Sequence, residues 1–125
     1  MNRSFVQCAE LLLAPDADPA APGGAVTLAL CGSWDHAGEC RWPHQTSTEW
    51  EERRVRVRVV FVAAAADEDD VRALIDRALA GGECVGPDGR RNRWTATEHG
   101  AGVLSESEKA LAAGIAGAHG AGQQA

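Results

Sequence analysis

The clearest pattern along the chain is the alternation of apolar and polar positions between residues 49 and 64. From residue 54 to residue 59 each arginine is followed by a valine, and at Val60 and Val62 the positions that would continue the arginine series become apolar. A period of two is typical of a β-strand with one face in the core. The pattern therefore predicts one long strand over 49–64, covered on both faces in its second half.

A helical period follows this strand. Apolar residues recur at intervals of three and four, at Val71, Leu74, Ile75, Ala78 and Leu79. The acidic run 67–70 stands where it stabilises the positive end of a helix, and Gly81 and Gly82 follow as a stop signal. We expect an amphipathic helix here and a short strand over 93–98. Such a strand–helix–strand unit predicts a right-handed crossover between parallel strands.

The first quarter of the chain is predicted to form two strands. Residues 4–13 favour a strand with mixed alternation, and residues 25–32 are a short apolar run that suits an interior strand. Between them, three prolines and two glycines over 14–24 indicate an exposed connection. The two strands are expected to pair as a wide hairpin.

The end of the chain predicts a weak helix and a tail. Ser105 and Glu108 have the spacing of a capping box, but the glycines that follow weaken a helix. We expect a single domain over 1–119 and a disordered tail over 120–125. The predicted order is β-β-loop-β-α-β-α, an α+β fold. It is a small mixed sheet with one main amphipathic helix packed on it, as in a ferredoxin-like or related α+β sandwich.

Composition and charge narrow the class of protein. The net charge of −6 disfavours non-specific nucleic-acid binding, and the longest apolar run, 59–66, is far shorter than the roughly 20 residues that span a bilayer. The beginning of the chain does not resemble a signal peptide, so a cytoplasmic location is expected. Eleven arginines against one lysine suggest a GC-rich bacterial genome. The arginines of the long strand could form a basic patch, but the overall acidity favours pairing with glutamates on neighbouring strands.

Chemistry-bearing side chains concentrate in one short segment. Cys31, His36, Cys40 and His44 are spaced C-x4-H-x3-C-x3-H, and two thiols with two imidazoles are a donor set that zinc favours. Four protein ligands would make a closed structural zinc site. Three ligands and a water would leave a position for Lewis-acid chemistry, with Asp35 or Glu39 as the candidate base.

The same segment allows other interpretations, and whether the protein is an enzyme stays open. Cys31 could be a small buried side chain at the end of a strand. Cys40, beside Arg41 and close to two histidines, could be the nucleophile of a thiol-dependent enzyme. A third hypothesis is a non-enzymatic module that binds a small molecule or a protein. It would use the tryptophan-rich segment 34–50, with candidate ligand-binding residues Trp34, Arg41, Trp42 and Trp50.

The tryptophans have a plainer explanation, which is that a small domain uses its largest side chains to close one end of a sheet. Val60 and Val62 offer a further hypothesis. If these valines form an apolar patch on the sheet, a second copy of the chain could cover them, which makes a homodimer a candidate assembly.

Overall fold

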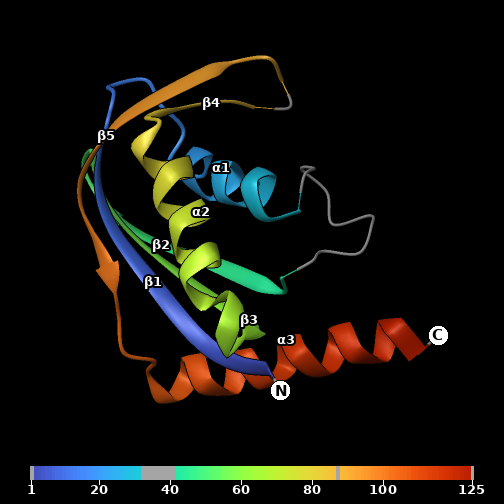
Figure 1. Ribbon diagram of the computed structural model, residues 1–125. Helices are drawn as coiled ribbons and strands as arrows, with labels where there is room; N and C mark the ends of the chain where they lie inside the picture. The colour runs from blue at the N-terminus through green and yellow to red at the C-terminus, as the bar shows by residue number, and fades with distance from the viewer. Residues whose placement is uncertain (1, 32–41, 87, 125) are drawn as a thin grey trace.

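The computed structural model describes residues 2–31, 42–86 and 88–124, with side chains described as far as residue 115. These described residues form an α+β fold with one curled antiparallel sheet and three helices (Figure 1). In chain order the elements are β1 (Asn2–Leu13), α1 (Ala21–Cys31), β2 (His44–Glu51), β3 (Arg54–Ala64), a 3-10 turn (Ala65–Asp67), α2 (Glu68–Ala80), β4 (Glu83–Val85), β5 (Arg91–Ala101) and α3 (Glu106–Gln124).

The strands lie in the order β2-β3-β1-β5-β4, and every neighbouring pair is antiparallel. The mixed sheet predicted from the sequence is therefore wrong. β5, which contains the strand predicted over 93–98, does run parallel to β3, but β1 lies between them and pairs with both. In the same way β3 lies between β1 and β2.

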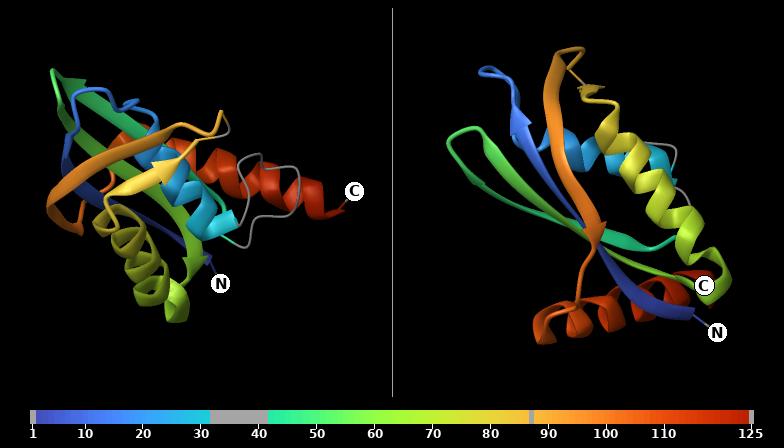
Figure 2. Two further views of the ribbon diagram at one scale, coloured as in Figure 1. Left: turned by 90° about the horizontal axis from the view of Figure 1, so that it is seen from above. Right: turned by 60° about the vertical axis from the view of Figure 1, so that its left-hand side comes forward.

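The sheet curls around α1 and α2, while α3 packs across one end of its other face (Figure 2). The main core lies under the first two helices, where alternate residues of β3 meet the apolar stripe of α2. Val71, Ile75 and Leu79 are buried, so the amphipathic helix expected after residue 67 is confirmed. The N-terminal strand is confirmed as well, over a longer range.

The apolar run 25–32 is not a strand, because most of it belongs to α1. The buried residues of this helix, which include Ala21, Ala25 and Val26, recur at helical spacing and lie against α2. Short apolar runs fit a buried helix as well as a buried strand, and Pro22 is tolerated in a first helical turn. The predicted N-terminal hairpin is therefore wrong.

The predicted strand 49–64 is in fact a hairpin. β2 ends at Glu51 and β3 begins at Arg54, and the reversal between them places Glu52 at a φ of 58°. The turn has no glycine or asparagine, the residues that usually mark such a conformation, so the sequence carried no signal for it. The hairpin tip projects past the helices (Figure 2).

Val60 and Val62 are buried in a second apolar cluster on the other face of the sheet, with Val6 and Ala112. The expectation that this part of the strand is covered on both faces is confirmed. The cover is α3, so the valines on which the homodimer hypothesis rested make an intramolecular contact. α3 runs on to Gln124, through most of the segment for which disorder was predicted.

Candidate functional site

The two ends of the cysteine–histidine segment meet at one place in the fold. Cys31 is the last residue of α1 and His44 is the first of β2, and 3.8 Å separates Cys31 Sγ from His44 Nδ1. His44 Nδ1 also lies 3.1 Å from the carbonyl oxygen of Trp42. Cys31 is disulfide-bonded, so its sulfur is not a thiolate in this structure. The segment thus joins a helix to an edge strand, and not two core strands as predicted.

The other predicted members of this site lie outside the described residues. They are the candidate zinc ligands His36 and Cys40, the candidate bases Asp35 and Glu39, and the candidate ligand-binding residues Trp34 and Arg41. Within the part of the chain that is described, no group of three metal-ligating side chains comes together. Nor is any helix there both long and apolar enough to cross a bilayer.

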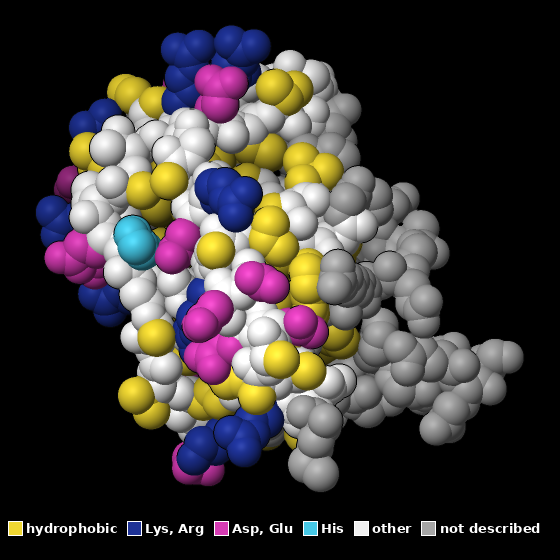
Figure 3. Space-filling model, viewed as in Figure 1, with side chains coloured by type: hydrophobic (Ala, Val, Ile, Leu, Met, Phe, Trp, Pro, Cys, Tyr) yellow, Lys and Arg dark blue, Asp and Glu magenta, His cyan; other side chains and the backbone are white. Residues whose placement is uncertain are grey.

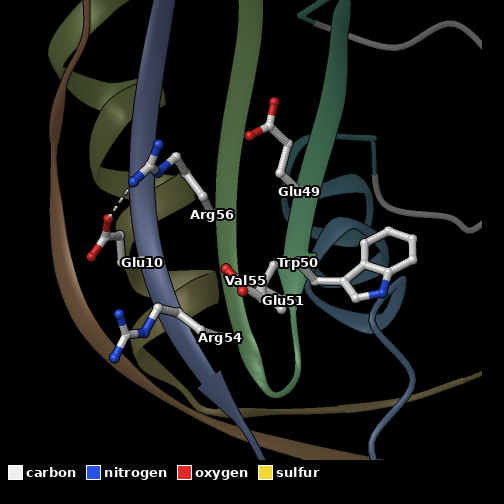
Figure 4. Close-up of a pocket in the computed structure, with 7 residues that line it drawn as sticks. All are labelled: Glu10, Glu49, Trp50, Glu51, Arg54, Val55 and Arg56. Carbon is white, nitrogen blue, oxygen red and sulfur yellow. Dashed lines mark hydrogen bonds and ion pairs between the residues drawn. The ribbon is translucent and has the colours of Figure 1, made fainter.

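The two described tryptophans of the segment differ in their surroundings. Trp42 is partly buried against the main core. Trp50 is 59% exposed, although it stands on an eight-residue strand. In Figure 4 its indole extends from β2 on the side away from β3.

The face of the sheet opposite α1 and α2 carries a row of charged side chains across four strands. The row joins Glu49 of β2, Arg56 of β3, Glu10 of β1 and Glu98 of β5, each directly opposite the next. Arg56 donates to Glu10 at 3.3 Å. This contact confirms for Arg56 the expected pairing with glutamates of neighbouring strands.

A cavity of about 250 Å³ lies over this charged face and reaches the β2 edge (Figure 4). Its lining joins the hairpin to β1 and is formed by Glu10, Glu49, Trp50, Glu51, Arg54, Val55 and Arg56. On the helix-bearing side of the molecule, acidic and basic side chains are interspersed with apolar ones (Figure 3). The charged row and the exposed Trp50 are therefore the features that distinguish the hairpin.

Arg58 anchors α3 to the same sheet face. Its guanidinium donates two hydrogen bonds of 2.7 Å to the carboxylate of Glu108, and one of 2.9 Å to the carbonyl of Val103. These bonds lower the pKa of Glu108 to about 2 and raise the pKa of Arg58. Glu108 also accepts from the backbone of Ser105, whose hydroxyl accepts from the backbone of Glu108. The predicted capping box is thus confirmed, and its carboxylate has a second function as the anchor.

A third group of polar side chains lies between β1 and α2. Gln7 is buried, donates to Asp76 at 2.7 Å and accepts from Arg72, whose guanidinium lies over the rings of Phe5 and Phe61. Each of these polar side chains has a hydrogen-bond partner, so the three residues together stabilise the packing of α2 on the sheet.

Cys8 lies on the sheet face beside Arg58, whose guanidinium nitrogen is 3.4 Å from its sulfur. A shallow cavity of about 360 Å³ opens over it and includes His99, which pairs with Asp76 at 3.2 Å. Cys84 is buried, and burial raises the pKa of its thiol. The sequence did not single out either cysteine for a function. In the structure Cys8 contacts a charged side chain and Cys84 packs in the core.

Comparison with protein-family models, with curated proteins and with solved structures found no match for this chain.

The sequence singled out Trp50 as a candidate binding residue but missed the glutamates on either side of it. The signal was present in Glu49-Trp50-Glu51, which alternates charged and aromatic residues. The pattern predicts one strand over 49–64, and a single strand gives these glutamates no edge position. Only the hairpin turns Glu49 and Glu51 into residues of an outer strand.

Proposed function

We propose that this protein is an interaction module that binds partner chains at β2. The observation that carries the proposal is the 59% exposure of Trp50 on the outermost strand of the sheet. Tryptophan is enriched among residues that dominate binding energy, and an edge strand offers unpaired backbone groups to another chain. Trp50 also lines the charged cavity, together with Glu49 and Arg56.

The fold gives such a surface a rigid base. We infer that β1, α1, β2, β3, α2 and β5 form a ferredoxin-like sandwich, to which β4 and α3 are additions. The support is the β-α-β-β-α-β order, in which each helix connects strands that have another strand between them. In this arrangement β2 is held by β3 along its whole length, from the pair His44–Phe61 to the pair Glu51–Arg54.

A displayed library of random peptides tests the proposal. Wild-type protein should enrich a set of peptides, and Trp50→Ala should lose most of them because the indole provides the central apolar contact. Val85→Ala is the matched control, since Val85 is also exposed and lies on the far edge strand. Enrichment that is equal for wild type and Trp50→Ala would overturn the assignment of β2 as the binding surface.

A second candidate function rests on the closeness of Cys31 and His44. With zinc–sulfur and zinc–nitrogen distances near 2.3 and 2.0 Å, two donors on one tetrahedral ion lie roughly 3.5 Å apart. The 3.8 Å between Cys31 Sγ and His44 Nδ1 is compatible with this separation. A zinc site would need the disulfide of Cys31 to be reduced, because only a thiolate binds the metal.

The zinc proposal has a direct test. Protein reduced and purified without a metal-affinity tag should hold about one equivalent of zinc by elemental analysis, and His44→Ala should lose it. Reduced protein that takes up no zinc at micromolar concentration would rule out this function. That result would leave the β2 proposal unaffected.

A further inference from the structure

We propose that the partner of β2 is an extended basic segment of another chain, which adds to the sheet as a strand beside β2. This inference rests on the proposed function and specifies the chemistry of the partner. The segment would carry two cations separated by one apolar residue. The cations would lie opposite Glu49 and Glu51, and the apolar residue would lie opposite Trp50.

The protein's own β3 shows that this pattern fits. In the hairpin, Arg56 is opposite Glu49, Val55 is opposite Trp50 and Arg54 is opposite Glu51. β2 is therefore already paired on one side with the sequence Arg-Val-Arg in antiparallel register. A strand added to the other side meets the same three side chains, because facing residues of neighbouring strands share a face of the sheet.

The charges of β2 are available for a partner. Among the ion pairs of the described residues, none includes Glu49 or Glu51, and the opposing Arg56 pairs with Glu10 of β1 instead. β2 itself contains no lysine or arginine. A second copy of β2 would bring more carboxylates and no cations, so charge complementarity favours a basic partner over self-association.

The edge also has few of the features that prevent strand addition. β2 is eight residues long and contains no proline, glycine or lysine, which are common devices for blocking an edge. Its side chains at Gln45, Ser47, Glu49 and Glu51 are exposed. Main-chain hydrogen bonds would supply affinity, and the carboxylates with Trp50 would supply selectivity, as in other cases of strand addition.

The test uses labelled synthetic peptides and the full-length protein. The probe is a peptide with the sequence of residues 54–59, Arg-Val-Arg-Val-Arg-Val. It is compared with a peptide of the same composition, Arg-Arg-Arg-Val-Val-Val, and with one that has glutamate in place of each arginine. By fluorescence anisotropy the wild type should bind the alternating basic peptide at least tenfold more tightly than either of the others.

Charge exchange on β2 gives the decisive comparison. The double variant Glu49→Arg with Glu51→Arg should lose at least tenfold in affinity for the basic peptide and gain affinity for the acidic one. Glu83→Arg with Glu106→Arg changes the net charge equally at exposed positions off β2 and should stay within about twofold of wild type. Because new arginines opposite Arg54 and Arg56 could destabilise the hairpin, Glu49→Gln with Glu51→Gln is the milder variant, with an expected loss of about threefold to tenfold.

Equal losses in the β2 variants and the control pair would show that net charge alone attracts the peptide, and would overturn the inference. Absence of binding to the wild type at millimolar peptide would overturn it too. If library peptides depend on Trp50 but carry no cations, or if the chain self-associates through β2, the basic partner is wrong. The function of β2 as an interaction surface would stand in both of those cases.

Discussion

Glu108 is the residue on which the position of α3 depends most directly. Its carboxylate caps the first turn of the helix and at the same time binds the guanidinium of Arg58 on the sheet. The Arg58 side chain is one-third exposed and that of Glu108 is mostly buried, with 12% exposed, so solvent weakens the pair only in part. A charged pair in this setting can make stability depend on pH.

Glu108→Gln should lower the free energy of unfolding at pH 7 by on the order of 2 kcal/mol. The folded-state pKa of Glu108 is lowered to about 2 from an ordinary value of 4.5, so its contribution is complete above pH 4.5 and is lost as pH falls towards 2. Urea denaturation should therefore show a difference in the free energy of unfolding between wild type and variant, and this difference should become smaller as the pH falls from 7 to 3. Glu106→Gln, at a carboxylate that is 93% exposed, should change stability by less than about 0.5 kcal/mol. A difference in the free energy of unfolding that is the same at both pH values would contradict the ion-pair explanation.

Gly102 is a second residue with a defined steric function. A Cβ at this position would lie 2.5 Å from Cys8 Sγ and 3.2 Å from a methyl group of Val6. Gly102→Ala should cost about 1–3 kcal/mol of stability, because an overpacked side chain must move or strain the backbone.

A double-mutant cycle isolates the Cys8 contact. In a Cys8→Ala background the sulfur is absent, so Gly102→Ala should cost at least 1 kcal/mol less than it does in the wild type. Thermal or urea unfolding of the four proteins gives the coupling. An equal cost in both backgrounds would show that the backbone, and not Cys8, requires glycine here.

At the scale of elements, the sequence predicted best where one period extends over a full element. The α2 stripe and the alternation in the first half of β3 identified a helix and a strand correctly, because burial there is one-sided and regular. α1 was misassigned because its run has almost no polar face, so periodicity carried no information. The conformation of α1 depends on its tertiary contact with α2, and the local sequence pattern does not predict that contact.

The β2–β3 turn was missed for a different reason. The backbone of Glu52 has a positive φ, which is rare for residues other than glycine, asparagine and aspartate. Two features of the candidate site depended on this turn, namely the edge position of Trp50 and the outward row of glutamates. Cys31 and His44, by contrast, lie 3.8 Å apart whatever the conformation of this turn, because they belong to α1 and to the first residue of β2.

Glu52→Gly should stabilise the hairpin by up to about 1 kcal/mol, because glycine adopts a φ of 58° without steric cost. Arg53→Gly is the control, since the residue beside Glu52 has no such positive φ and glycine there only adds chain entropy. Urea denaturation measures both variants. Stabilisation by Arg53→Gly but not by Glu52→Gly would contradict the account of the turn.

At the scale of the whole molecule, the net charge of −6 and the carboxylates of β2 act in the same direction. Both attract a basic segment, but only the β2 carboxylates select its register. Raising the salt concentration from 50 to 500 mM should weaken binding of the alternating basic peptide several-fold, since exposed charges are screened. The advantage of the alternating peptide over its same-composition counterpart should persist at high salt, because backbone pairing and the Trp50 contact are not screened. If both peptides bind equally tightly at high salt, the interaction is a non-specific attraction between charges.

Amide hydrogen exchange of the protein with and without the alternating basic peptide is the most direct test of strand addition at β2. The account predicts new protection at alternate amides between Gln45 and Glu51, those that point away from β3, and little change in β4 and β5 at the opposite edge. Peptide binding that leaves the β2 amides unprotected, or that protects β5 instead, would contradict the central claim.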